Sequence, residues 1–144
     1  MARGKVDLSQ FNFHIEFHPR FSDLDAFGHV NNARIFTYFE EARVAYLKHL
    51  GIFLPHVSPI SIVIQRAECS FLAPIMHHHL VQVFIRSQRW GVRSFDFSYA
   101  VWLPEEDLLA ATGSTRAVSY DLSKRRSAPI PPEYLERMKG FEGQ

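Results

Sequence analysis

Residues 21–51 read FSDLDAFGHVNNARIFTYFEEARVAYLKHLG and contain the change from a polar loop to a long helix. Before Ala33 the stretch contains Ser22, Asp23, Asp25, Gly28, Asn31 and Asn32, which is typical of an irregular loop that ends in a helix cap. From Ala33 to Leu50 apolar residues recur at helical spacing, which predicts one long amphipathic helix. Gly51 follows where a left-handed C-terminal cap would stand.

Strand patterns flank this helix on both sides. Phe11–Phe17 alternates apolar with polar side chains and predicts a half-buried strand before the loop. Four later segments carry alternating or β-branched apolar residues: Ile60–Phe71, Val81–Ile85, Phe95–Val101 and Leu108–Tyr120. Short connections separate them: Pro74–His79, Trp90–Arg93 and Pro104–Asp107. We therefore expect these strands to pair antiparallel in sequence order, through hairpins.

The order of elements predicts the architecture. One strand, a loop, one long helix and four strands indicate an α+β fold, in which a strongly bent antiparallel sheet wraps around the central helix. Pro131–Lys139 opens with prolines and predicts a short terminal helix. We expect residues 1–144 to form a single domain. Because such a sheet has open edges and a half-covered face, a homodimer or homotetramer is expected.

Composition excludes several classes of function. The formal net charge is +1, so no overall field favours nucleic acid or an acidic membrane surface as a partner. Cys69 is the only cysteine, which rules out an intrachain disulfide. Met1–Gln10 lacks the apolar stretch of a signal peptide, and no apolar run approaches the length of a membrane span. The expected location is the cytoplasm.

The block Asp25–Asn32, running directly into the helix, resembles the hot-dog-fold thioesterases of the 4-hydroxybenzoyl-CoA thioesterase type. Its His-Val-Asn-Asn wording, from His29, is also similar to the plant acyl-acyl carrier protein thioesterases. Weaker similarity continues through Phe71–Pro74, Tyr120–Asp121 and the segment 129–132. The resemblance implies the hot-dog fold and the hydrolysis of acyl-CoA or acyl-acyl carrier protein thioesters, as in fatty acid metabolism, without a cofactor.

The same resemblance implies that Asp25 is the catalytic carboxylate, acting as a nucleophile or as the base that activates water. Thioester hydrolysis also needs hydrogen-bond donors for the developing oxyanion, and a helix N-terminus supplies unpaired backbone N–H groups. The residues that would surround the substrate here are Gly28, His29, Asn31 and Asn32. Two points weigh against a simple transfer. Phe27 replaces an Asn of the plant-type motif, and Asp25 could instead be a turn or capping residue, as could Asp23.

Two basic groups are candidates for the phosphates of CoA. Arg86, Arg89 and Arg93 bracket one predicted hairpin, and Lys124, Arg125 and Arg126 follow the last strand. Basic residues at turns are more often simply solvated. Two other functions stay open beside hydrolysis: a non-catalytic module that binds acyl thioesters, and a hot-dog hydratase or dehydratase. The second is disfavoured because Asp25 and His29 are four residues apart rather than five.

Other reactive side chains receive structural interpretations. Glu40 and Glu41 on the helix are expected to pair with Arg43 or Arg34 rather than to act on substrate. Cys69 lies in an apolar strand and is expected to be a small buried residue. The run His77–His79 is assigned to a solvated hairpin, because adjacent histidines cannot all face one ion and no acidic partner is near in sequence. No metal site is predicted.

Overall fold

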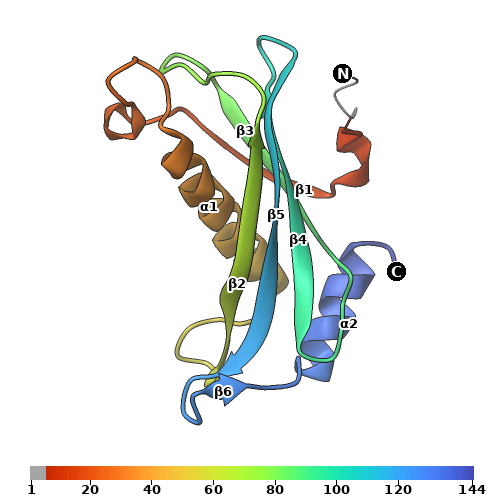
Figure 1. Cartoon of the computed structure of the whole chain (residues 1–144). Helices are drawn as coiled ribbons and strands as arrows, with labels where there is room; N and C mark the ends of the chain where they lie inside the picture. The colour runs from red at the N-terminus through yellow and green to blue at the C-terminus, as the bar shows by residue number, and fades with distance from the viewer. Residues whose placement is uncertain (1–5) are drawn as a thin grey trace.

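The long helix α1 (Asn32–Leu50) lies on the concave side of a strongly curved, six-stranded antiparallel sheet in the computed structural model, which describes residues 6–144 (Figure 1). The strands are β1 (Phe13–Phe17), β2 (Ile60–Phe71), β3 (Val81–Gln88), β4 (Ser94–Leu103), β5 (Leu108–Asp121) and β6 (Arg126–Ser127). The remaining elements are η1 (Leu8–Gln10), η2 (Phe21–Asp23) and α2 (Pro132–Phe141). The predicted bent sheet around one central helix is confirmed. Part of the segment considered for a signal peptide, residues 1–5, lies outside the described residues.

Both ends of α1 carry the caps that its sequence predicts. The Asn31 side chain accepts a hydrogen bond from the Ala33 N–H, which ties down the first turn. At the other end Gly51 adopts a left-handed conformation with φ 68°. Asn32 is the first helical residue, one position before the predicted start of the helix at Ala33. No helix within residues 6–144 is long and apolar enough to cross a membrane.

The expectation that all strands pair in sequence order is wrong for β2. The sheet order is β1-β3-β4-β5-β2, so β2 pairs with β5 along its whole length and never meets β3. Residues 72–80 therefore form a crossing connection rather than a hairpin. The β3–β4 and β4–β5 hairpins are present as predicted. A period of two specifies which face of a strand is buried but not which strand lies beside it, and this explains the error.

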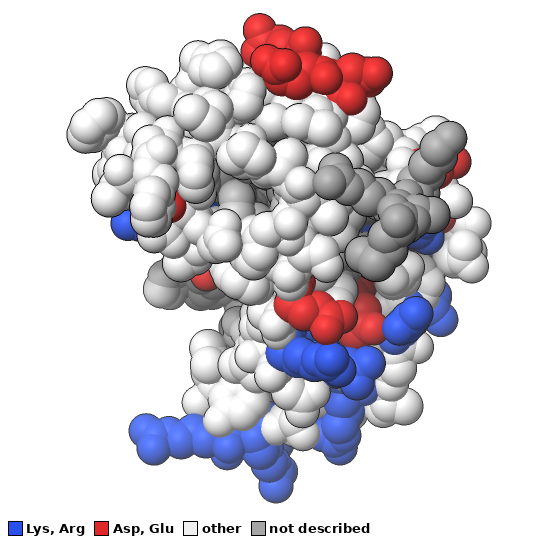
Figure 2. All heavy atoms as spheres, turned by 45° about the horizontal axis from the view of Figure 1, so that its top comes forward, with Lys and Arg blue, Asp and Glu red and all other residues white. Residues whose placement is uncertain are grey.

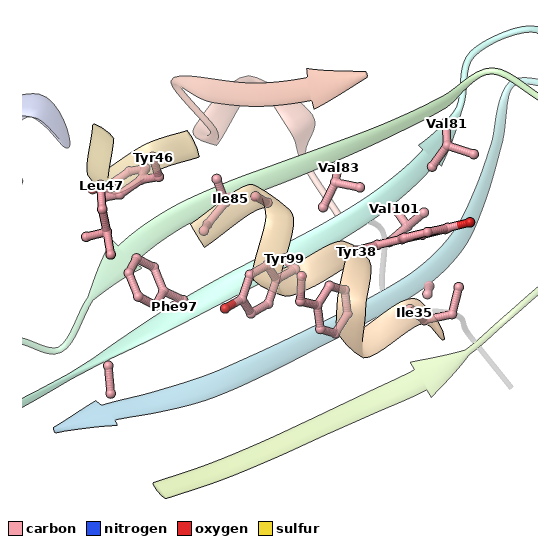
Figure 3. Close-up of a cluster of buried hydrophobic side chains, with 14 of the residues drawn as sticks. Ile35, Tyr38, Tyr46, Leu47, Val81, Val83, Ile85, Phe97, Tyr99 and Val101 are labelled. Carbon is pink, nitrogen blue, oxygen red and sulfur yellow. The ribbon is translucent and has the colours of Figure 1, made fainter. Parts of the chain in front are cut away.

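The core forms between α1 and the inner face of the sheet (Figure 3). Fully buried Phe39 from α1 stacks on Tyr99 of β4, with ring centroids 4.2 Å apart and planes 10° apart. Val81, Val83 and Ile85 alternate along β3 and face the same helix. Each such side chain removed from water contributes about 1.5–3 kcal/mol to stability, so this interface fixes where α1 lies.

Helix α2 is anchored by a buried polar cluster. Glu142, which follows α2, accepts hydrogen bonds at Oε2 from the Tyr46 hydroxyl at 2.7 Å and from the Ser87 N–H at 2.9 Å. Burial raises the pKa of Tyr46 well above its ordinary range, so the phenol stays protonated and can donate. Tyr46 lies on α1 and Ser87 on β3, and the cluster thus joins the end of the chain to both layers of the core.

Candidate active site

A tight turn between η2 and α1 positions the predicted catalytic residue. The Asp25 N–H donates to the His29 carbonyl at 2.9 Å, and the Gly28 N–H donates to the Asp25 carbonyl at 3.1 Å. Gly28 has φ 86°, a backbone conformation that residues with a side chain rarely adopt. The turn alone therefore explains why this residue is glycine. Leu24 and Val30 form a short antiparallel bridge at the base of the turn. Residues 24–30 are therefore an ordered loop that leads straight into α1.

The Asp25 carboxylate is half-buried, with its two oxygens in different environments. Oδ1 accepts a hydrogen bond from the Phe27 N–H at 2.9 Å, the contact expected of a turn residue. Oδ2 lies 3.8 Å from Nδ1 of His29. The side chains of Asp25 and His29 are 22% and 39% exposed, so a ligand can reach both. One oxygen thus serves the turn, while the other faces an imidazole and remains open to a reacting partner.

Asp23 has a structural role that Asp25 lacks. Its carboxylate is buried, and Oδ2 accepts hydrogen bonds from the Tyr38 hydroxyl at 2.7 Å and from the Arg20 N–H at 3.0 Å. Burial and this bond raise the pKa of Tyr38 far above its usual value. Asp23 fastens the turn to α1, which leaves Asp25 as the accessible carboxylate of the pair.

A cavity of about 370 Å³ opens beside the N-terminus of α1. His29, Val30, Asn32, Ile35, Phe71, Leu72, Ala73, Pro74, Ile75, Ala110 and Ala111 line it. Most of these side chains are apolar, whereas His29 and Asn32 bring polar groups to one side. Since the cap Asn31 occupies the Ala33 N–H, the Asn32 N–H is the first-turn amide that no acceptor within residues 6–144 takes. The cavity is therefore an apolar chamber with two polar residues, His29 and Asn32, on one side, and the backbone N–H of Asn32 is a free donor.

Part of the cavity wall was missed by the sequence reasoning. The predicted hairpin at Pro74–His79 places Pro74 and Ile75 in a turn, yet both residues run beside the loop before α1 and line the cavity. The Val30 N–H donates to the Ile75 carbonyl at 2.8 Å, which holds the two segments together. The weak family similarity of Phe71–Pro74 was the signal in the sequence that pointed to this wall. A simple turn between paired strands would not explain that similarity.

The two basic groups lie at the other end of the sheet. Lys124, Arg125 and Arg126 surround the turn between β5 and β6, at the opposite end of β5 from the cavity residues Ala110 and Ala111 (Figure 1). Figure 2 shows Lys and Arg side chains gathered at that end and an acidic cluster at the other. Along β5 the distance from these cavity residues to the basic turn is roughly 34 Å, at about 3.4 Å per residue. Within one chain these residues and Asp25 are far apart.

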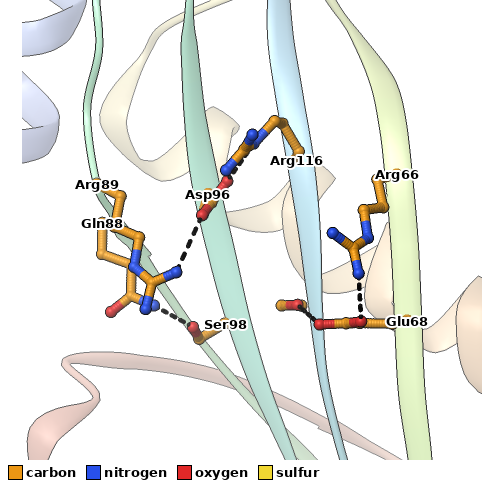
Figure 4. A network of polar contacts seen from close by, with 8 residues as sticks. Arg66, Glu68, Gln88, Arg89, Asp96, Ser98 and Arg116 are labelled. Carbon is orange, nitrogen blue, oxygen red and sulfur yellow. Dashed lines mark hydrogen bonds and ion pairs between the residues drawn. The ribbon is translucent and has the colours of Figure 1, made fainter.

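Arg89 and Arg93 also have partners within the fold. Arg89 lies 3.9 Å from the Asp96 carboxylate, which Arg116 contacts at 3.0 Å, on the outer face of the sheet (Figure 4). Arg93 donates to the Ser127 carbonyl at 2.9 Å, so this member of the first basic group lies beside β6, which contains Arg126 of the second. Arg86 lies on the outer side of β3, and its buried Nε has no hydrogen-bond partner among residues 6–144.

The histidine run lies in the connection between β2 and β3 and not in the expected hairpin, and the fold brings it an acidic neighbour that is distant in sequence. Glu106 from the β4–β5 turn comes close to His78 and His79, and the potential ligand atoms of the three residues lie within 4.8 Å of one another. However, Nδ1 of His79 accepts a hydrogen bond from the Met76 N–H at 2.9 Å. The neutral ring must then carry its proton on Nε2, the atom that faces Glu106, so Nε2 has no lone pair for a metal.

The remaining reactive side chains have structural surroundings. Burial raises the pKa of the Cys69 thiol to about 11, so it stays protonated and is a poor nucleophile at neutral pH, although it is only half-buried. Glu40 lies 3.8 Å from Arg43 on the same helix. Arg43 in turn donates to the Tyr99 hydroxyl at 3.2 Å. These groups belong to the packing of α1 and of the sheet, and not to the cavity beside Asp25.

Comparison with known proteins identifies the family. The model of the thioesterase-like superfamily matches residues 19–138, nearly the whole chain and all of the site. The chain belongs to the thioesterase-like superfamily. The predicted enzyme class, a thioesterase, is thereby confirmed at the level of the family, as is the predicted fold.

Named thioesterases stand among the relatives of this superfamily member. A 1,4-dihydroxy-2-naphthoyl-CoA hydrolase of Microcystis aeruginosa is 27% identical over 83% of this chain and 87% of that protein. A thioesterase from Thermus thermophilus, solved with coenzyme A and zinc, is 31% identical with a TM-score of 0.81, covering 94% of this chain and 98% of that one. The uncharacterized protein YsmA of Bacillus subtilis is 30% identical over 63% of this chain, and the match spans 61% of the length of YsmA.

Proposed function

We propose that this thioesterase hydrolyses acyl-CoA thioesters, with Asp25 as the reacting carboxylate. The observation that carries the proposal is the accessible Asp25–His29 pair, 3.8 Å apart, beside a cavity and the N-terminus of α1. The preference for CoA as the carrier rests on the Thermus thioesterase solved with coenzyme A and on the Microcystis CoA hydrolase. An acyl carrier protein substrate, which the plant-type wording of the motif would imply, has no comparable support.

The proposed chemistry uses few groups. The acyl chain enters the apolar cavity, and the thioester carbonyl accepts a hydrogen bond from the Asn32 N–H, the free amide of the first turn. Oδ2 of Asp25 then either attacks the carbonyl carbon or takes a proton from the water that does so. If Asp25 attacks, the C–S bond breaks, the carrier leaves as a thiolate, and water then hydrolyses the mixed anhydride, which restores the carboxylate. If water attacks, breakage of the C–S bond gives the free acid directly. In both routes the thiolate takes up the proton that the water loses.

His29 is proposed to orient the substrate or the water beside Asp25. It lines the cavity and faces Oδ2, whereas Asn31 acts as a cap and Gly28 as a turn residue. Phe27, which stands where the plant-type motif has Asn, is 83% exposed, and its ring lies nearly parallel to that of His29. Any step that depends on this Asn in relatives is absent from the mechanism proposed here.

We propose that dimerisation places the basic residues of one copy near the active site of the other. Within residues 6–144, β2 pairs only with β5, so no strand covers the backbone N–H and C=O groups of its other edge. Val63 and Phe71 on this strand are exposed. We propose a homodimer in which β2 pairs antiparallel with β2 of a second copy. Such pairing sets the Ile60 end of one copy beside the Phe71 end of the other. The Lys124–Arg126 turn of one copy then approaches the cavity of the other, where it can bind CoA phosphates.

The first prediction concerns this assembly. Light scattering at micromolar concentration should give the mass of a dimer or of a dimer of dimers. Replacing Val63, in the first half of β2, by proline should shift the population toward monomer, because proline distorts the edge that the second copy pairs with. β5 lies between β2 and β4, so it has no free edge for a second copy. A wild-type protein that remains monomeric would rule out the dimer.

The second prediction tests the reaction itself. A panel of acyl-CoAs, with aliphatic and aromatic acyl groups, and one acyl-acyl carrier protein should be assayed for release of the thiol. We expect turnover with CoA thioesters and little with the carrier protein. Binding of acyl-CoA without turnover of any substrate would favour the non-catalytic module instead. Addition of water to an enoyl-CoA, with no thiol released, would favour a hydratase.

A further inference from the structure

The connection between β2 and β3 supports the loop that carries Asp25. The Val30 N–H donates to the Ile75 carbonyl at 2.8 Å, and the next residues along, His29 and Met76, form an isolated antiparallel bridge. Val30 and Ile75 are both buried, and both line the cavity. The position of His29, and through the turn that of Asp25, therefore depends on where residues 75 and 76 are held.

His79 fixes residues 75 and 76 through hydrogen bonds to the Met76 backbone. Its ring is almost completely buried, and Nδ1 accepts a hydrogen bond from the Met76 N–H at 2.9 Å. The His79 N–H donates to the Met76 carbonyl at 3.1 Å, so His79 contacts both polar groups of the Met76 backbone. The His79 carbonyl in turn accepts a hydrogen bond from Nδ1 of His18 at 3.0 Å. These hydrogen bonds fix His79, and His79 can in turn fix the position of the loop that carries Asp25.

The second ring nitrogen of His79, Nε2, faces a carboxylate. Nε2 of His79 lies 3.5 Å from a carboxylate oxygen of Glu106, in the turn between β4 and β5. The adjacent Glu105 accepts a hydrogen bond from the Leu80 N–H at 3.1 Å, which ties the same turn to the same connection. A donor facing Nδ1 and a carboxylate facing Nε2 select the neutral tautomer with its proton on Nε2.

We infer that His79 is a positioning residue for the reaction: through the Met76 N–H it holds the Asp25–His29 loop against the cavity. This inference rests on the proposed function of Asp25, but the hydrogen bonds that it invokes can be tested without any substrate. His79 touches neither the cavity nor Asp25, so its effect must pass through the backbone of residues 75–76. Placement of catalytic groups is sensitive to small displacements, since a shift of about 1 Å can cost on the order of 10²-fold in rate.

The third prediction compares two substitutions of His79. His79→Leu keeps a side chain of similar bulk but leaves the Met76 N–H without its acceptor. His79→Asn puts an amide oxygen near the position of Nδ1 and restores the acceptor. We expect kcat to fall about 10-fold in His79→Leu with a smaller change in KM, and to stay within about twofold of wild type in His79→Asn. His77→Leu, in the same connection but exposed, is the matched control and should keep normal kinetics.

A kcat for His79→Leu near that of wild type would overturn the inference, and so would equal losses in the leucine and asparagine variants. A measurement on the wild type covers the case in which His79→Leu does not fold. Nitrogen-15 NMR of the ring should find the proton on Nε2, and the Met76 and Val30 amides should exchange slowly with solvent. A proton on Nδ1, or rapid exchange at Met76, would contradict it. If the wild type turns over no thioester, the proposed function fails, while the NMR result still decides whether His79 holds the loop.

Discussion

Replacing Asp25 by asparagine should lower kcat for acyl-CoA hydrolysis by about 10²-fold or more. The amide keeps the shape of the side chain, and its oxygen can still accept the Phe27 N–H bond that Oδ1 accepts in the wild type. What it loses is the negative charge that attacks the thioester or takes a proton from water. Folding should be almost unaffected, because a partly exposed carboxylate near a helix N-terminus contributes at most about 1 kcal/mol.

Asp23→Asn is the matched control for this experiment. Asp23 is buried and accepts hydrogen bonds from the Tyr38 hydroxyl and the Arg20 N–H, so loss of its charge should cost about 1.5–3 kcal/mol of stability. Its kcat should fall far less than that of Asp25→Asn, because the amide oxygen can still accept the two hydrogen bonds that hold the turn. Measuring kcat and Tm for both variants separates a catalytic carboxylate from a structural one. Near-normal turnover by Asp25→Asn would end the mechanism proposed for this site.

The second large effect is expected in the core, at Gly113 of β5. A Cβ built at Gly113 would come within 2.6 Å of the Phe39 ring atom Cζ and within 2.7 Å of the Glu68 carbonyl oxygen. Neither neighbour can yield easily, because Phe39 is stacked on Tyr99 and the carbonyl belongs to β2. Gly113→Ala should therefore destabilise the protein by about 2–3 kcal/mol, which corresponds to a fall in Tm of roughly 10 °C.

Gly140→Ala is the same chemical change in a different environment. Gly140 lies in α2, and an added Cβ there would meet no atom within 4 Å. Alanine favours the helix, so this variant should be more stable by about 0.5 kcal/mol. Thermal unfolding of both variants would then give changes of opposite sign. A Gly113→Ala protein as stable as Gly140→Ala would mean that Phe39 does not pack against β5 as described.

Much of the local structure was predictable because it depends on near neighbours in the chain. The helical spacing after Asn31 and the cap at Gly51 define α1 to within one residue. The β-branched run Ile60–Phe71 has the same ends as β2. Caps act over a few residues, and alternation records which side of a strand is buried, so both leave a local trace.

The order of the strands in the sheet was not predictable in the same way. β2 crosses to the far edge and pairs with β5, although β3 is next in the chain. Both pairings bury the same face of β2, so its pattern does not distinguish them. The choice depends on how α1 packs and on the lengths of the two partners, with β5 spanning 14 residues and β2 12. These are properties of the assembled sheet.

The candidate site was likewise predictable from the sequence only in part. The sequence by itself determined the family block Asp25–Asn32, the caps of α1 and hence the candidate carboxylate with its helix N-terminus, because these residues are contiguous. Only the tertiary structure decided which aspartate is buried, which wall closes the cavity and that His79 lies behind it with Glu106 beside its ring. Met76 bridges to His29 although the whole of α1 and β2 separates them in the chain. Contacts at such a separation form only when the sheet closes around α1, and no local pattern records them.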